Sequence, residues 1–209
     1  MILEEWLYSS ECDSTAIVLP DGCCDVIFQQ DEQHRFSFSI TSLDSCAYEV
    51  DLSKGVSLRG FRLKPGAVVD ETSLAEFLAH EPEPSKREST WLDEFCTVKA
   101  SVNEALEGLR SDLNGIGAVA KNLGVSVRTL QRHIRLETGK SPYFWISLVR
   151  ARRCARLLAG AADLTDAALA SGYADQSHMT RELQRWFQCT PLAFKQGHCH
   201  NEIRLSGYD

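Results

Sequence analysis

The clearest structural signal in the chain is the segment Ala118-Val-Ala-Lys-Asn-Leu-Gly-Val-Ser-Val-Arg-Thr-Leu-Gln-Arg-His-Ile-Arg-Leu-Glu-Thr-Gly139. Residues 118–123 predict a short amphipathic helix, and Gly124 and Val125 predict a tight turn. Ser126 is a typical N-cap for a second helix that runs from Val127 to Glu137 and closes at Gly139. A helix, a three-residue turn and a second helix form the geometry that holds the second helix clear of the body, where it can enter a major groove.

The second of these helices has one apolar and one polar face. Leu130, Ile134 and also Val127 are expected to face the core. The opposite face carries side chains of the types that hydrogen-bond to purine edges or contact phosphates, namely Arg128, Gln131, Arg132 and Arg135. This helix therefore has the composition of a DNA-recognition helix.

The same pattern occurs again further along the chain. Ser141 and Pro142 predict the start of a long helix through Leu158, which ends at Gly160. Residues 164–171 then predict a short helix, residues 172–173 a turn, and Asp175 the N-cap of a helix over 176–187, stopped by Thr190-Pro191. The outer face of that helix carries Gln176, Ser177, His178 and Arg181, and its core stripe is Met179, Leu183 and Phe187.

Four arginines lie on the long joining helix, at positions 150, 152, 153 and 156. They could form a stripe that contacts nucleic acid. They are also spaced to pair with nearby acids or to lie in solvent, as exposed helix charges usually do. We favour the structural interpretation for these four.

Two helix-turn-helix units joined by a long helix resemble the DNA-binding domain of the AraC/XylS family of bacterial transcription regulators, over about residues 112–196. The matching residues are Ala120, Gly124, Ser126, Leu130-Gln131-Arg132, Gly139-Lys140-Ser141-Pro142, Arg150, Leu157-Leu158, Ala168, Gly172-Tyr173-Ala174-Asp175-Gln176-Ser177, Arg181 and Thr190-Pro191. The resemblance implies a monomeric seven-helix domain that places two recognition helices in successive major grooves, about 34 Å apart on one face of the duplex.

The resemblance also implies roles for individual residues. The base-reading positions fall on Arg128, Gln131 and Arg132 in the first unit and on Ser177, His178 and Arg181 in the second, with backbone contacts for Gln176 and Arg135. RNA polymerase is the implied protein partner. The chain departs from the family pattern at Ala167, Met179, Leu183, Cys189 and Lys195. The first four are core or turn positions, so they bear on the stability of the second unit rather than on its role.

The net charge of −7 at first argues against a nucleic-acid partner, because phosphate contacts need a positive surface. The charge is unevenly distributed, however. Residues 1–111 carry 9 basic against 21 acidic side chains, a net −12, whereas residues 112–198 carry 12 against 6, a net +6. The asymmetry indicates different partners for the two parts, with a boundary near Ser111–Gly117.

The acidic part begins with short apolar runs separated by turn residues. The sequence predicts strands around 17–19, 26–28 and 36–40, and a hairpin in which 48–52 pairs with 56–63 through the turn at 53–55, giving a small antiparallel sheet that extends to about residue 66. The stretches Pro20-Asp21-Gly22-Cys23 with Asp25, and Gly60 to Ala67, resemble the short β-rich domain that precedes the DNA-binding domain in one group of AraC-type regulators. Its sheet is short for a barrel that encloses a ligand, so a small-molecule effector, dimerisation and contact with another protein all stay open.

Two helices are expected after the sheet, within about 73–109. The first covers 73–80 and is stopped by Pro82 and Pro84. The second runs from about Trp91 to Leu109, with one apolar stripe formed by Leu92, Phe95, Val98, Val102, Leu106 and Leu109. This stripe either packs on the sheet of the same chain or pairs with its copy in a homodimer.

The eight cysteines, at positions 12, 23, 24, 46, 96, 154, 189 and 199, show no C-x-x-C spacing, and we expect reduced, mostly buried thiols. The run His198-Cys199-His200 lacks a fourth ligand nearby, so no metal or other cofactor is expected. A thiol or metal sensor, or a cysteine-based alkyl-transfer enzyme, acting through Cys23 or Cys24 is an alternative, although Asp21 and Asp25 oppose the low thiol pKa that it needs.

The sequence therefore predicts an α+β protein: an acidic β-rich regulatory or dimerisation domain over 1–111, an all-α DNA-binding domain over 112–198 and a polar tail over 199–209. We expect a DNA-binding transcription regulator rather than an enzyme, with double-stranded DNA as its partner. An adaptor that has lost DNA binding is the other alternative, and the arginines on both presenting helices oppose it. The acidic N-terminus and the lack of a long apolar stretch favour a cytoplasmic location without membrane contact.

Overall fold

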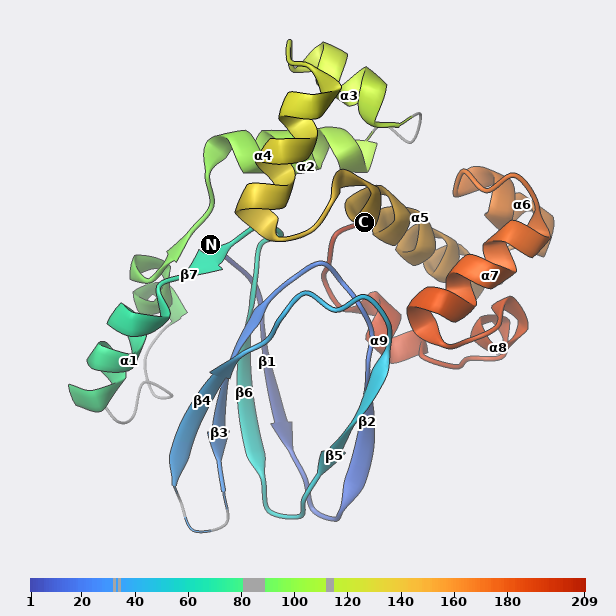
Figure 1. The fold of residues 1–209 in the computed structure, drawn as a ribbon. Coiled ribbons are helices and arrows are strands. Elements are labelled where there is room, and N and C mark those ends of the chain that lie inside the picture. The colour runs from blue at the N-terminus through green and yellow to red at the C-terminus, as the bar shows by residue number, and fades with distance from the viewer. Residues whose placement is uncertain (32, 34, 81–88, 112–114) are drawn as a thin grey trace.

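The computed structural model describes residues 1–31, 33, 35–80, 89–111 and 115–209. Strands dominate up to Leu63 and helices dominate after Ala100, and the helical part lies across one end of the strands (Figure 1). The predicted α+β class, with a β-rich part followed by an all-α part, is confirmed.

The strands form a four-stranded antiparallel sheet in the order β1-β6-β3-β4, and a two-stranded sheet of β2 and β5. Their bounds are β1 Ile2–Ser9, β2 Ser14–Val18, β3 Asp25–Gln30, β4 Phe36–Ile40, β5 Tyr48–Leu52 and β6 Ser57–Leu63. The central strand β6 is paired on both sides, because Gly60 lies opposite Trp6 of β1 and opposite Ile27 of β3. The predicted strands are all present, and β1 is an addition that the sequence did not indicate.

The predicted hairpin between 48–52 and 56–63 is wrong. Strand β5 pairs with β2, with Val50 opposite Ala16, while β6 belongs to the other sheet. The turn at 53–55 instead carries the chain from one sheet to the other, and Gly55 there donates a backbone hydrogen bond to Ser10 (2.8 Å). Both strands need partners that lie far away in sequence, which a local turn signal does not reveal.

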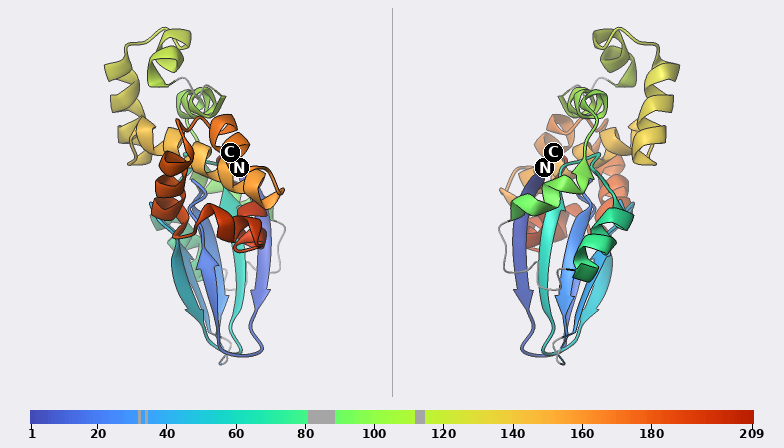
Figure 2. Two further views of the ribbon diagram at one scale, coloured as in Figure 1. Left: turned by 90° about the vertical axis from the view of Figure 1, so that its right-hand side faces the viewer. Right: turned by 90° about the vertical axis from the view of Figure 1, so that its left-hand side faces the viewer.

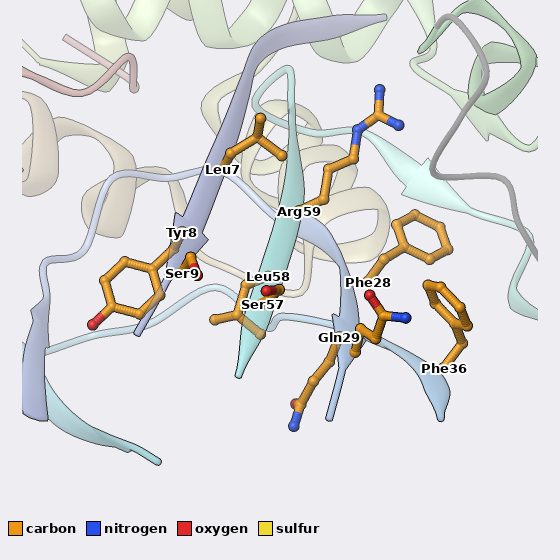
Figure 3. A pocket seen from close by; sticks show the side chains of 10 residues that line it. Leu7, Tyr8, Ser9, Phe28, Gln29, Phe36, Ser57, Leu58 and Arg59 are labelled. Atoms are coloured by element: carbon orange, nitrogen blue, oxygen red, sulfur yellow. The ribbon is translucent and has the colours of Figure 1, made fainter. Parts of the chain in front are cut away.

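One face of the larger sheet packs against α1 (Glu71–His80) and a 3₁₀ turn, η2 (Ser89–Glu94). The core there consists of Val26, Phe28, Phe61, Leu63, Leu74, Leu92 and Cys96. Further along the same face, Leu7 is 76% exposed and borders an open hollow with Phe36 and Arg59 (Figure 3). Arg59 is held there by an ion pair to Glu5 (2.7 Å).

The predicted single helix over 91–109 is also wrong. The segment divides into η2, a short strand β8 (Cys96–Thr97) that pairs with β7 (Val68–Val69), and α2 (Ala100–Ser111). Leu92 is buried against the sheet, whereas Val102, Leu106 and Leu109 are buried against other helices. The apolar residues of the predicted stripe are therefore divided between two hydrophobic cores of the same chain. The apolar face of α2 is buried within the chain, so it is not free to pair with its copy in a homodimer.

The remaining helices are α3 (Ile116–Asn122), α4 (Val127–Thr138), α5 (Pro142–Ala159), α6 (Leu164–Ala170), α7 (Gln176–Phe187), α8 (Pro191–Lys195) and α9 (His200–Arg204). Helices α3 to α7 match the predicted helices closely, whereas α8 and α9 are additions that the residue pattern did not indicate. Helix α2 packs against α3, α4 and α5, so seven helices, α2 to α8, pack together as the resemblance implied, but α2 lies before the expected boundary at residue 112. The core of this half is centred on α5, in which Trp145, Leu148 and Leu158 are fully buried.

Residues 199–209 are not a polar tail. They form α9 and a C-terminal strap, Leu205–Asp209, which lies between the sheets and the helices (Figure 1). Tyr208 is buried, its ring packs on Trp145 (4.9 Å between centroids), and its hydroxyl donates to the carbonyl of Leu106 (2.6 Å). Gly22 has a positive φ of 78°, and a Cβ there would come within 2.8 Å of Tyr208 Cβ, so the strap requires glycine at this turn.

Candidate nucleic-acid interface

Helix α4 is fixed by its caps and its buried face. Ser126 Oγ accepts a hydrogen bond from the Thr129 amide (3.0 Å), and Gly139 closes the helix in the left-handed conformation. Leu130 and Ile134 are buried, as predicted, whereas Val127 is 38% exposed and does not belong to the core. Val127 is in the first turn of the helix, before the apolar face meets its neighbours.

The four predicted side chains of α4 all face solvent. Arg128, Gln131, Arg132 and Arg135 are exposed, and among the described residues none of them has a hydrogen-bond or ion-pair partner for its side chain. Helix α3 and the start of α4 lie at the end of the molecule farthest from the sheets, whereas the C-terminal end of α4 borders β4 and β7 (Figure 2). The donors of this helix are therefore available to an external partner.

Helix α7 is built in the same way. Asp175 Oδ1 accepts from the His178 amide (2.7 Å), and Met179, Leu183 and Phe187 are buried, as predicted. The substitutions relative to the family pattern at 167, 179, 183 and 189 all lie in the interior. Of the outer residues, Ser177 and Arg181 are exposed.

Two predicted residues of α7 are partly engaged inside the domain. Gln176 Nε2 donates to Thr165 Oγ1 of α6 (2.6 Å), and the ring of half-buried His178 packs edge-on against Tyr173 (5.2 Å between centroids). Both contacts link α7 to the preceding helix and turn, so these side chains orient the recognition helix as well as reaching its outer surface.

Arg152 and Arg156, two of the four arginines on α5, form contacts within the protein. Arg152 is completely buried and donates to the carbonyls of Leu205 (2.9 Å) and Pro20 (3.4 Å). Arg152 and Arg156 both form ion pairs with Asp209 of the C-terminal strap. The structural interpretation of these two residues is confirmed, and they are not part of a DNA-contacting stripe.

The structure adds a residue to the surface near α4. Tyr143, at the start of α5, is 63% exposed and lines a hollow together with Gln131, Arg135 and Arg150. An exposed aromatic beside arginines can contact a sugar or a base. The position of Tyr143 directly after the Ser141-Pro142 helix start is the feature of the sequence that could have indicated this exposed aromatic residue.

Residues 119–197 match a family model described as a helix-turn-helix domain. Over 114 residues the chain is 30% identical to the HTH-type transcriptional activator RhaS of Escherichia coli, an alignment that covers 47% of this chain and 41% of the relative. Residues 119–197 are an AraC-type helix-turn-helix domain. The AraC-type domain thus contains α4, α5 and α7, which carry the interface described above. The chain spans about two-fifths of the length of the RhaS relatives that it matches.

Solved structures are similar to the chain as well. ToxT from Vibrio cholerae, at 9% identity, aligns with 94% of this chain and 98% of its own with a TM-score of 0.52, which extends the similarity of fold from the AraC-type domain to the β-rich part. A transcriptional regulator with an AraC-type DNA-binding domain from Chromobacterium violaceum aligns with 46% of this chain and 88% of its own, at 22% identity and a TM-score of 0.43.

The Cys23-Cys24 pair does not have the environment of a reactive thiol. Both residues precede β3 rather than alternating along a strand, and Cys23 is buried. Burial, reinforced by Asp21, raises the pKa of Cys23 above its ordinary value, and burial with Asp25 raises the pKa of Cys24 to about 11. At neutral pH the thiolate fraction of both is therefore reduced, which opposes a sensor or alkyl-transfer role.

Thiol titration of the native protein at neutral pH should give two fast-reacting cysteines, the exposed Cys12 and Cys46. We expect the others to react only after unfolding in denaturant. Labelling followed by peptide mass mapping identifies the fast sites. Fast labelling of Cys23 or Cys24 in the folded protein would restore the sensor hypothesis.

Within the described residues, no group of three or more His, Cys, Asp or Glu side chains is arranged to hold a metal ion. No helix in the same part of the chain is long and apolar enough to cross a bilayer.

Proposed function

We propose that this chain is a sequence-specific DNA-binding transcription regulator whose helices α4 and α7 enter successive major grooves. The observation that carries the proposal is that two capped helices, both packed on the buried helix α5, leave Arg128, Arg132 and Arg181 exposed. Arginine hydrogen-bonds bidentately to guanine in the major groove. The net charge of +6 over 112–198 adds the sequence-independent attraction to phosphates.

Each part of the chain has a place in this proposal. Arg128, Gln131 and Arg132 read one groove, and Ser177, His178 and Arg181 read the next, while Arg135 and Gln176 contact the backbone. Residues 1–111, apart from α2, form the regulatory part. RNA polymerase is the proposed protein partner, because the relative RhaS is described as a transcriptional activator.

Selection of bound sequences from random DNA by the full chain tests the proposal. We expect enrichment of one site at moderate salt, because base contacts add to the phosphate attraction. No enriched site would instead support the alternative of an adaptor that has lost DNA binding.

The Arg132→Ala variant should bind the selected site about 1–3 kcal/mol more weakly and lose its preference at one base pair. The reason is the loss of one bidentate contact to a base edge. Titration of the variant against the selected site and its single-base variants measures both effects. Equal weakening on every sequence would make Arg132 a phosphate contact instead.

A further inference from the structure

A cavity of about 330 Å³ lies between the two sheets of the β-rich part, on the face of the larger sheet opposite α1. Its size falls within the range of small-ligand pockets. The walls are mainly apolar, with side chains such as Ala16, Val18, Ile27, Val50 and Leu58 from both sheets. Trp6 closes one side, its ring lying across Gly60, where any Cβ would overlap the indole.

Among the described residues, Arg62 is the arginine that lines the cavity, and most of its N–H donors are bound by protein groups. Arg62 forms a bidentate pair with Asp25 (both 3.1 Å), an ion pair with Asp21 (3.1 Å) and a hydrogen bond to the Ser206 carbonyl (3.1 Å). Asp25 also accepts from Trp6 Nε1 (3.0 Å). The charge of Arg62 is thus balanced by two carboxylates, and the described lining contains no other basic side chain that could bind an anionic ligand.

Two further carboxylates line the cavity, those of Asp44 and Glu202, and both residues are half-buried. Among the described residues neither carboxylate forms an ion pair within 4.0 Å. Asp44 accepts a hydrogen bond from Tyr48, and burial raises its pKa, which means that its charge is incompletely compensated. The charge of Lys140 acts to lower the pKa of Asp44, but Lys140 does not line the cavity, and its ammonium group contacts Ser45 Oγ (3.4 Å) and the Phe144 ring (5.0 Å).

We propose that this cavity binds a small molecule with an apolar body and a cationic amine, the amine lying at Asp44 and Glu202, and that this ligand regulates the proposed DNA binding. The described lining residues carry four carboxylates against one arginine, so a cationic group is complementary to the cavity and a carboxylate is not. The regulatory part rests on the proposed function.

The loop between β4 and β5 links the cavity to the recognition helices. Thr41 and Asp44 line the cavity, and Ala47 in the same loop is buried against the end of α7. The Ala47 amide donates to the Trp186 carbonyl (2.7 Å), and Gln188 Nε2 donates to the Ala47 carbonyl (2.7 Å). A ligand that moves Asp44 therefore acts on the helix that carries Arg181.

The C-terminal strap gives a second link. Glu202 and Leu205 line the cavity, and the Leu205 carbonyl accepts hydrogen bonds from Arg152 (2.9 Å) and Arg156 (3.2 Å) of α5. Because α5 joins the two helix-turn-helix units, a ligand against α9 and the strap touches a segment that is bonded to this helix.

Calorimetric titration of the full chain, without DNA, with tryptamine and phenethylamine tests the binding site. Indole-3-acetate and 3-phenylpropionate are the matched anions. We expect the amines to bind at least tenfold more tightly than the anions. Asp44→Asn and Glu202→Gln, which are nearly isosteric, should each weaken amine binding about tenfold, because a charged hydrogen-bond partner is lost. Glu49→Gln, an exposed acid on β5 that does not line the cavity, should leave it unchanged.

Three results would overturn the site: no binding of either amine, equal binding of the anions, or unchanged amine affinity in both carboxylate variants. DNA titration with and without saturating amine tests regulation, and we expect an affinity change of about fivefold or more. An unchanged DNA affinity contradicts the regulatory part. A chain that binds amine but selects no DNA site refutes the proposed function, whereas a chain that selects DNA but binds no amine refutes this inference alone.

Discussion

Replacing Arg132 and Arg181 together by alanine should abolish most of the sequence-specific affinity for DNA. The two side chains lie on α4 and α7, in separate helix-turn-helix units, and each is expected to contribute about 1–3 kcal/mol. Losses at separate sites are approximately additive, so the double variant should bind about 2–6 kcal/mol more weakly, a factor of about 30 to 10⁴. Anisotropy titration of the selected site at fixed salt measures the loss.

Arg185→Ala is the matched control for this experiment. Arg185 is an exposed arginine of α7, but it pairs with Glu182 one turn earlier (3.2 Å) and lies outside the proposed reading positions. Its removal changes the net charge by one unit, as each single arginine variant does. If Arg185→Ala weakens binding as much as Arg181→Ala, the arginines act through general charge and α7 does not read bases.

Replacing Arg152 by alanine should destabilise the protein by about 3–5 kcal/mol, because it leaves the buried carboxylate of Asp209 without its innermost partner. The change also leaves the carbonyls of Pro20 and Leu205 without this donor. The guanidinium is 0% exposed and joins α5, the strap and the turn before β3.

Urea denaturation followed by circular dichroism measures this effect. Arg153→Ala, one residue further along the same helix and only half-buried, is the control and should change stability by less than about 0.5 kcal/mol. A loss below about 1 kcal/mol in Arg152→Ala would mean that the strap does not hold the two parts of the fold together.

The parts of this fold that could be predicted from the sequence are those specified by neighbouring residues. Ser126, Ser141 and Asp175 each cap the helix that follows, and Gly139 ends α4, so both helix-turn-helix units and their outward faces could be located. The exposed positions of Arg128, Arg132 and Arg181 follow from helical periodicity alone.

The parts that could not be predicted depend on distant residues. Leu92 and Leu106 fit one helical stripe, yet they enter different cores, because the chain between them pairs as a strand with β7. Arg152 has the sequence context of a surface arginine, and the groups that compensate its burial, Asp209 and the carbonyls of Pro20 and Leu205, lie far from it in the sequence. The cavity likewise depends on the pairing of β2 with β5, which no local turn specifies.

The central claim is that α4 and α7 read two major grooves at once. Methylation interference at guanine N7 on the selected site tests it most directly, because N7 is exposed in the major groove. We expect two interfering clusters about 10–10.5 base pairs apart on one face of the duplex, and loss of one cluster in each of the variants Arg132→Ala and Arg181→Ala. The claim would be contradicted if only one cluster of interfering guanines were found, and if that cluster were lost in only one of the two variants.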